Sequence, residues 1–218
     1  GLFLEEVIQQ FKNLGYKNIW WKIVCAADYG VPQMRYRMFM IGNRLGVDFE
    51  APPKTNFPIG SGKFPEYTTV GDAIMDLVGK ENHVANHVPL NHKPIVAARY
   101  KYVKEGCKLN LDDLPPELAI ATRRDSKTGK IVNYSHVYKR LDRNSPSTTM
   151  VPGHNAFPIH PTLNRTLTAR EAARIQTFPD SHIFFGTRQE QCIQVGNAVP
   201  PKMAEPFFKK INLYLSQS

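Results

Sequence analysis

The stretch from Arg165 to Asp180, RTLTAREAARIQTFPD, governs the local fold of the C-terminal part of the chain. Thr168 precedes Glu171 by three residues, which is the capping-box pattern that begins a helix. We expect this helix to reach about Thr177, because a proline follows at position 179 and cannot continue it. The pattern therefore predicts a short helix with two well-marked ends.

A second punctuated stretch, QVGNAVPP, follows at residues 194–201. Gly196 and Asn197 predict a turn, and Pro201 suits the first turn of a final helix, where an N–H has no partner to lose. We expect one face of that helix to be apolar, formed by Met203, Phe207, Phe208, Ile211 and Leu215.

The N-terminal residues predict part of an α/β sheet. Apolar residues recur at helical spacing from Leu4 to Leu14. Segments 19–26 and 36–41 are rich in aromatic and β-branched residues, which predicts two strands around the loop DYGVPQMRYR at 28–37. Two strands are too few to enclose a core, so we expect only a portion of the sheet here.

The middle of the chain has a different texture. Prolines and glycines cluster after residue 51, which is typical of a linker or an irregular lobe. Residues 70–78 predict a short amphipathic helix, and residues 131–138 predict a strand after a turn at Thr128 and Gly129.

Composition narrows the classes of function. The 218 residues include 28 Lys and Arg against 19 Asp and Glu, a net charge of +9 that favours a polyanionic partner. No apolar run is long enough to span a membrane. The three cysteines, Cys25, Cys107 and Cys192, are widely spaced, which favours a reducing, cytoplasmic compartment.

The loop at 28–37 and the stretches at 165–180 and 194–201 together resemble the DNA cytosine-5 methyltransferases of bacterial restriction-modification systems. The three stretches occur in the same order as in the family, and a long variable segment separates the first from the second. Both features strengthen the resemblance. It implies an α/β fold: a partial Rossmann-like methyltransferase sheet, with its last strands and final helix, plus a small irregular mixed α+β target-recognition domain. The implied boundaries are 1–52 for the catalytic strands, 53–164 for target recognition, and 165–218 for the hinge and returning helix.

Three motifs of this family are absent from the 218 residues: its cofactor loop, its Pro-Cys nucleophile and its Glu-Asn-Val segment. No cysteine follows a proline, so we expect all three to be structural thiols. The chain starts at Gly1 rather than Met, so we expect a C-terminal portion, inactive alone, that needs a missing N-terminal catalytic half.

The resemblance assigns supporting catalytic roles to Arg35 and Arg37, the two arginines of a Q-x-R-x-R motif. On a strand both would point to one face. We expect Arg37 to reach an extruded cytosine or its phosphate, and Arg35 to bind a carboxylate of the missing half. Gln33 should fix the loop by hydrogen bonds close to the DNA, while Tyr36 and Met38 should be buried on the opposite side.

The same resemblance places Gly196, Asn197 and Ala198 beside the pocket for S-adenosyl-L-methionine. Backbone amides and the Asn amide at a helix start suit a carboxylate. The alternative is a turn and helix start without a ligand, and one wall of a pocket should bind the cofactor weakly.

The resemblance implies double-stranded DNA as the partner of the basic residues, and a merely solvated basic face is the alternative. We expect Arg165 to contact a phosphate. The simpler interpretation of the charged residues at 165–174 is a local ion pair between Glu171 and Arg174. With Gln33 and Arg37, the predicted DNA contacts are Arg123, Arg124, Lys127, Lys130, Arg140 and Arg165.

Two other functions stay open: a non-catalytic DNA-binding subunit of a split methyltransferase, and a fragment acting on tRNA. The spacing of His83, His87 and His92 does not favour a metal, because no cysteine lies near and Pro89 interrupts them. An incomplete sheet should also expose apolar residues and promote homo-oligomers; the expected ones are Trp20, Trp21, Phe39 and Ile41.

Overall fold

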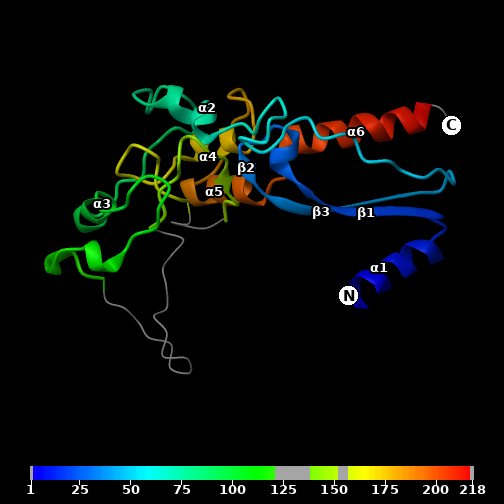
Figure 1. The fold of residues 1–218 in the computed structure, drawn as a ribbon, viewed down its shortest axis with the longest axis horizontal. Coiled ribbons are helices and arrows are strands. Elements are labelled where there is room, and N and C mark those ends of the chain that lie inside the picture. The colour runs from blue at the N-terminus through cyan, green and yellow to red at the C-terminus, as the bar shows by residue number, and fades with distance from the viewer. Residues whose placement is uncertain (1, 121–137, 152–156, 217–218) are drawn as a thin grey trace.

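The computed structural model describes residues 2–120, 138–151 and 157–216 (Figure 1). The predicted strand at 131–138 and the basic residues 123–130 fall outside these ranges, apart from Tyr138. The helices and strands are α1 (Leu2–Asn13), β1 (Asn18–Cys25), β2 (Gln33–Met34), β3 (Tyr36–Asn43), α2 (Val70–Ile74), α3 (Pro94–Tyr100), β4 (Ser147–Thr148), α4 (Ala169–Ile175), α5 (Arg188–Asn197) and α6 (Pro201–Ser216). Short 3-10 turns lie at Ala26–Tyr29, Met75–Leu77, Leu111–Asp113 and Pro116–Leu118.

Strands β1 and β3 form the antiparallel hairpin that the sequence predicts. Their register runs from Asn18 opposite Asn43 to Cys25 opposite Tyr36. The connecting loop begins with a 3-10 turn whose C-cap, Gly30, has a φ of 75°, a conformation that glycine adopts without steric cost. The loop then forms β2 before it enters β3, so the Q-x-R-x-R residues lie at the mouth of the hairpin.

Helix α6 lies along one face of this hairpin (Figure 1). Phe207 is its central contact: its ring stacks on Phe39 with centroids 4.4 Å apart and also touches Tyr29 and Trp20. The expected exposure of Trp20, Phe39 and Ile41 is therefore wrong, because α6 covers these side chains. Met203, Phe207 and Ile211, three residues of the predicted apolar face, pack against the hairpin.

Phe208 and Leu215 do not belong to that buried face and are exposed instead. The helical spacing predicts a wider apolar stripe than the narrow hairpin can cover.

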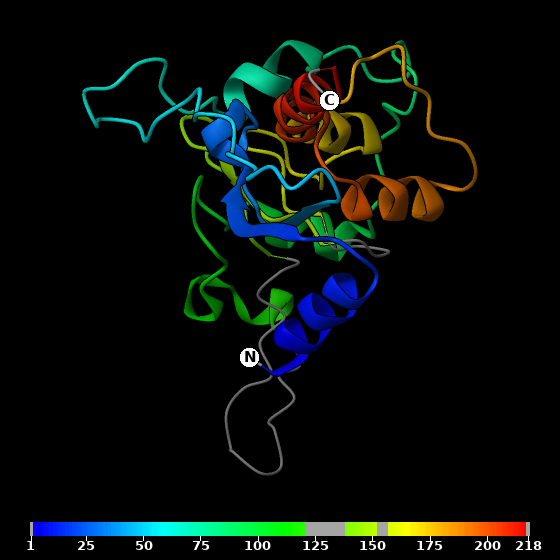
Figure 2. The ribbon, with the colours of Figure 1, turned by 90° about the vertical axis from the view of Figure 1, so that its right-hand side faces the viewer.

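The opposite face of the hairpin stays apolar and exposed. Trp21 is 43% exposed, Ile23 65%, Tyr36 55% and Met38 54%. The predicted burial of Tyr36 and Met38 is wrong, because alternation along β3 turns them away from α6. Helix α1 lies on this side of the hairpin (Figure 2) and leaves these residues uncovered.

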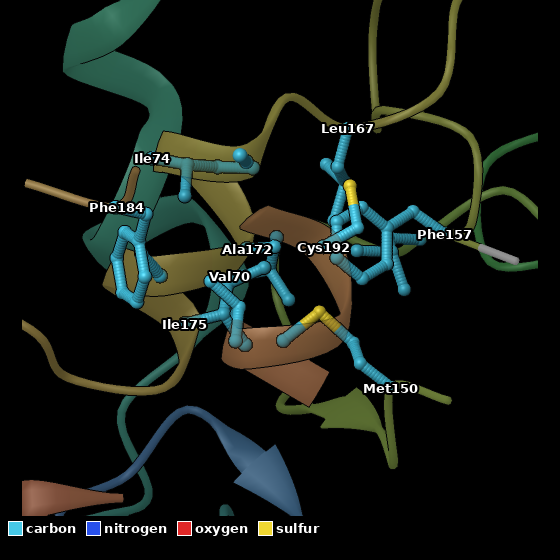
Figure 3. Packing of buried hydrophobic residues seen from close by; sticks show 13 residues of the cluster. Val70, Ile74, Met150, Phe157, Leu167, Ala172, Ile175, Phe184 and Cys192 are labelled. Carbon is cyan, nitrogen blue, oxygen red and sulfur yellow. The ribbon is translucent and has the colours of Figure 1, made fainter. Parts of the chain in front are cut away.

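A second core lies under α2, α4 and α5 (Figure 3). It contains Val70 and Ile74 from α2, Ala172 and Ile175 from α4, and Cys192 from α5. The predicted capping box is confirmed, since Thr168 accepts from the Glu171 amide and Glu171 accepts from the Thr168 amide. This cluster combines residues from the predicted recognition segment and the segment after it.

Residues 194–197 are helical, which corrects the predicted turn at Gly196 and Asn197. A capping box between Thr187 and Glu190 starts α5, and the helix continues through Asn197. Gly and Asn have low helix propensity, but the burial of Val195 on the second core outweighs it.

A two-residue parallel pairing links the hairpin loop to residues 147–148, in the predicted recognition segment. Gln33 pairs with Ser147 and Met34 pairs with Thr148. The Thr149 hydroxyl also donates to the Met34 carbonyl, at 3.0 Å. These bonds hold the segment at β4 against the Q-x-R-x-R loop.

Substituting Phe207 tests the hairpin core. Phe207→Ala should lower the free energy of unfolding by about 3–5 kcal/mol, because a buried aromatic ring is lost and a cavity remains. Phe208→Ala, one residue on but 69% exposed, is the matched control and should change stability by less than about 0.5 kcal/mol. Urea unfolding followed by tryptophan fluorescence measures both, and equal losses would refute this packing.

Candidate functional site

Arg35 lies at the junction of three segments that are far apart in the sequence. Its Nη2 donates to the carbonyl oxygens of Gly196 (2.9 Å) and Ala198 (3.0 Å), at the end of α5. Its Nη1 donates to the carbonyl of Met150, at 3.5 Å. The side chain is 1% exposed. One guanidinium therefore ties the hairpin loop to β4's segment and to the 194–201 motif.

The charge of Arg35 survives this burial. Burial and the neighbouring charge of Arg37 lower its pKa to about 10, which leaves it protonated at neutral pH. The carbonyls at the C-terminal end of a helix carry partial negative charge and suit a cation. Within this chain Arg35 therefore bonds carbonyl oxygens, and the carboxylate partner from another portion stays a prediction.

Arg37 occupies a different environment. Arg35 precedes β3, so the two arginines do not share a strand face as expected. Arg37 is only partly buried, opposite Val24, and its Nη1 donates to the carbonyl of Tyr36 at 2.7 Å. Of the two, Arg37 is the one whose guanidinium can still reach a ligand.

Gln33 is fully buried, and no described residue bonds its side-chain nitrogen or oxygen. The predicted hydrogen bonds from its side chain are absent from the described residues, and its burial argues against a direct DNA contact in this conformation. Its position is fixed instead by the backbone pairing of β2 with β4.

Arg165 forms a buried ion pair that local spacing does not predict. Both its terminal nitrogens bond Glu171 at 2.8 Å, and Nη2 also bonds Glu81 at 3.1 Å. Glu171 therefore pairs with Arg165 rather than with Arg174, which binds Asp180 instead. The internal use of Arg165 argues against the predicted phosphate contact.

Two titratable groups of this cluster have shifted pKa values. Burial alone would raise the pKa of Glu171, but the bonds and charge of Arg165 outweigh it and hold the pKa below its ordinary value. Burial lowers the pKa of His160 to about 4, against an attraction to Glu171, whose carboxylate lies 3.7 Å from its Nε2. His160 is therefore neutral near pH 7.

Arg140 is also committed to the interior. It is 5% exposed and donates to the carbonyl oxygens of Val103, Tyr100, His160 and Leu163. The predicted phosphate contact at Arg140 is thus unsupported by its position. Arg123, Arg124, Lys127 and Lys130 lie outside the described residues, so their DNA contacts stay predictions.

The 194–201 motif presents its carbonyl oxygens, not its amides, to the site. The Ala198 amide donates to Gln194 and Val195 within α5, while the Gly196 and Ala198 carbonyls bind Arg35. This corrects the expected cradle of amides. Among the three predicted cofactor residues, Asn197 has the exposed side chain.

The histidines and cysteines have structural surroundings. His87 is buried between Thr168 and the Leu77 carbonyl, and His92 bonds Thr166. Within residues 2–120, 138–151 and 157–216, no group of three or more His, Cys, Asp or Glu is placed to hold a metal. Burial raises the pKa of Cys192, which disfavours its thiolate.

Residues missed by sequence reasoning include Glu81 and Met150. Both enter the site through tertiary contact across a long stretch of chain, Glu81 through its carboxylate and Met150 through its carbonyl oxygen. A carbonyl acceptor leaves no signal in the side-chain sequence, so only the fold reveals it.

Comparison with known proteins identifies the family. The model of the C-5 cytosine-specific DNA methylases matches residues 1–213. The chain belongs to this family. Type II methyltransferase M1.HphI of Haemophilus parahaemolyticus is 35% identical over 204 residues, which are 92% of this chain and 49% of that protein. M.NgoFVII of Neisseria gonorrhoeae is 32% identical, over 95% of this chain and 53% of that protein.

The chain thus spans about half the length of these curated relatives. Type II methyltransferase M.AquIB of a Picosynechococcus strain is matched over most of its own length. It is 36% identical over 145 residues, which cover 91% of that protein and 61% of this chain.

Solved structures agree on the fold. A protein described as a DNA modification methyltransferase of an Escherichia coli prophage superposes with a TM-score of 0.61 at 24% identity, over 91% of this chain and 61% of its own. The Entamoeba histolytica methyltransferase EhMeth gives 0.53 at 14% identity, over 99% and 59%. The mixed α/β fold is therefore that of DNA methyltransferases. Across the described part of the chain, no helix is both long and apolar enough to cross a membrane.

The Arg35 junction predicts unequal effects of two matched substitutions. Arg35→Lys should destabilise the chain by about 2–3 kcal/mol, because one ammonium cannot reach all three carbonyls and leaves buried acceptors unpaired. Arg37→Lys should cost less than about 1 kcal/mol, since Arg37 is partly exposed. Chemical denaturation measures both, and equal losses would contradict the assignment.

The Glu171–His160 cluster predicts acid sensitivity. His160 has a folded pKa of about 4 against an ordinary value of 6.5, so the unfolded state binds the proton first as the pH falls through this window. Stability should fall by on the order of 3 kcal/mol from this histidine alone. Below this window the depressed Glu171 pKa adds a further loss as its carboxylate protonates.

Melting temperatures from pH 7 to 4 test this account. His160→Asn keeps an acceptor for the Leu163 amide but does not titrate, so its profile should be flatter. A variant profile that is as steep as that of the unaltered chain would show that His160 does not carry the effect.

Proposed function

We propose that this chain supplies the DNA-recognition and cytosine-supporting part of a DNA cytosine-5 methyltransferase. The observation that carries the proposal is the junction at Arg35. It gathers the Q-x-R-x-R loop, the β4 segment at Met150 and the 194–201 motif into one place. The matching of residues 1–213 by the family model supports the same assignment.

Each group has a distinct part in this proposal. Arg37 supports the extruded cytosine or its phosphate, since its planar guanidinium suits either acceptor. Arg35 acts indirectly, by fixing the loop that carries Arg37. S-adenosyl-L-methionine, when bound, supplies the methyl group, and the exposed Asn197 side chain would border its pocket.

The nucleophilic thiolate must come from elsewhere in the whole enzyme. Cys25 and Cys192 are buried, and Cys192 has a raised pKa. Cys107 is exposed, but it lies in the loop after α3, in the predicted recognition domain. The chemistry needs a thiolate at C6 of the cytosine and an acid near N3, which these surroundings do not provide. The chain alone should therefore transfer no methyl group.

The exposed hairpin face supports a partner for this chain. Trp21, Ile23, Tyr36 and Met38 form an apolar surface on the side opposite α6. In the proposed enzyme, the portion that carries the nucleophile and cofactor loop covers this face and extends the sheet. Without that portion, the same face promotes homo-oligomers. The proposed compartment is the cytoplasm.

Radiolabelled methyl transfer tests the proposal. The chain alone should give no turnover, whereas the chain joined to the polypeptide encoded immediately upstream should methylate C5 of cytosine in duplex DNA. Arg37→Ala in the joined protein should reduce the rate about a hundredfold or more, if the guanidinium stabilises the reacting base. Turnover by the unaccompanied chain, or none by the joined protein, would overturn the proposal.

A second organisation has a specific observation in its favour. The match to this chain covers 91% of the length of M.AquIB. A relative that consists of little more than the matched region therefore exists as a separate polypeptide. The chain would then be a non-catalytic DNA-binding subunit of a split methyltransferase. A separate initiation codon, with activity restored by mixing two purified chains, would establish it. Competition between duplex DNA and tRNA distinguishes the remaining alternative of an RNA substrate.

A further inference from the structure

A small polar cavity lies beside β4, outside the junction at Arg35. Its volume is about 190 Å³. It is lined by Gly106, by residues 139–142 and by residues 145–148. Lys139 is the basic side chain at its wall that is not enclosed by protein acceptors, since Arg140 is committed to the interior.

Lys139 has a second lysine next to it. Lys108 and Lys139 are antiparallel bridge partners, flanked by the hydrogen bonds from Leu109 to Tyr138 and from Arg140 to Cys107. This pattern defines a non-hydrogen-bonded pair, the kind in which facing side chains approach most closely. Within the described ranges, neither lysine has an ion pair.

The acidic groups nearby are occupied by other partners. The Asp142 carboxylate, at the wall of the cavity, accepts from the Asn144 amide (2.9 Å) and the Ser145 hydroxyl (2.8 Å). Glu105 is paired with Arg143. The neutral donors at Asp142 leave its charge in place, but no carboxylate among the residues described lies within ion-pair distance of either lysine.

The electrostatics favour an anion at this point. Burial and the charge of Lys108 lower the pKa of Lys139. An anion between the two ammonium groups would relieve their repulsion. The Thr148 hydroxyl, 3.5 Å from the Lys139 Nζ, adds a neutral donor at the same wall.

One wall of the cavity, at β4, pairs with the Q-x-R-x-R loop. Thr148 is the register partner of Met34, the residue immediately before Arg35. A ligand held by Lys139 and Thr148 thus lies against the loop that carries Arg37.

We propose that Lys108, Lys139 and Thr148 form a subsite for a backbone phosphodiester of duplex DNA. The inference rests on the proposed function, because it assumes that duplex DNA passes the Q-x-R-x-R loop. Lysine binds phosphate as a point charge, and a threonine hydroxyl donates to phosphate oxygens without reading sequence. The subsite therefore contributes affinity and register, not base specificity.

Fluorescence anisotropy with a labelled random-sequence duplex tests the subsite. Each lysine that contacts a phosphate adds about 0.9 to the slope of log affinity against log salt, equivalent to about eightfold at ~0.1 M salt. Lys139→Gln should therefore weaken binding about eightfold and flatten the slope by about 1. Lys139→Arg keeps the charge and should restore most of the affinity.

Lys209→Gln is the matched control for net charge, because Lys209 lies on α6 in an exposed pair with Glu205. It should leave the slope unchanged, and melting curves must show that every variant is folded. If the unaltered chain binds no duplex, the proposed function fails. If it binds but Lys139→Gln and Lys108→Gln behave like the control, the subsite alone is refuted.

Discussion

The structure depends on one buried cation. Arg35 needs acceptors because an unpaired guanidinium is too costly to bury, and three carbonyls from two remote segments provide them. The same bonds satisfy carbonyls at the end of α5, where helical partners run out. These bonds place the hairpin loop, the β4 segment at Met150 and the 194–201 motif together. The position of Arg37 is a consequence of this arrangement.

Buried arginines recur throughout the chain and change the meaning of its charge. Arg170 donates to the carbonyls of Ala85, Pro179 and His182, and Arg140 lies in a similar cage. The Arg165 guanidinium is likewise directed inward, where it pairs with the carboxylates of Glu171 and Glu81. The net charge of +9 therefore overstates what a polyanion meets at the surface. Lysines that form no ion pair among the described residues, such as Lys108 and Lys139, become the better candidates for contact with a polyanion.

Local patterns predicted the elements well where the cause is local. The capping box at Thr168 and Glu171 involves neighbours in the chain, and it forms as expected. The hairpin strands follow their β-branched and aromatic residues. The helical end at Gly196 was missed because packing of Val195 on the second core overrides propensity. Three short motifs were enough to predict the family. The family model, which matches residues 1–213, confirms that prediction.

The site itself was less predictable than the fold. Spacing placed Arg35 and Arg37 on one face, but Arg35 lies before the strand and turns inward to carbonyl oxygens. Arg165 bonds Glu81, which lies 84 residues earlier in the chain. Sequence periodicity does not predict a contact over that separation. A sequence shows which side chains can donate hydrogen bonds. It does not show which backbone carbonyls will accept them, because that depends on the folded structure.

Backbone hydrogen–deuterium exchange on the unaltered chain and on Arg35→Lys tests the central claim most directly. If Arg35 joins the three segments, exchange should accelerate together in residues 147–150 and 188–198 while α1 is unchanged. Acceleration confined to the hairpin loop, or none in either remote segment, would contradict the account.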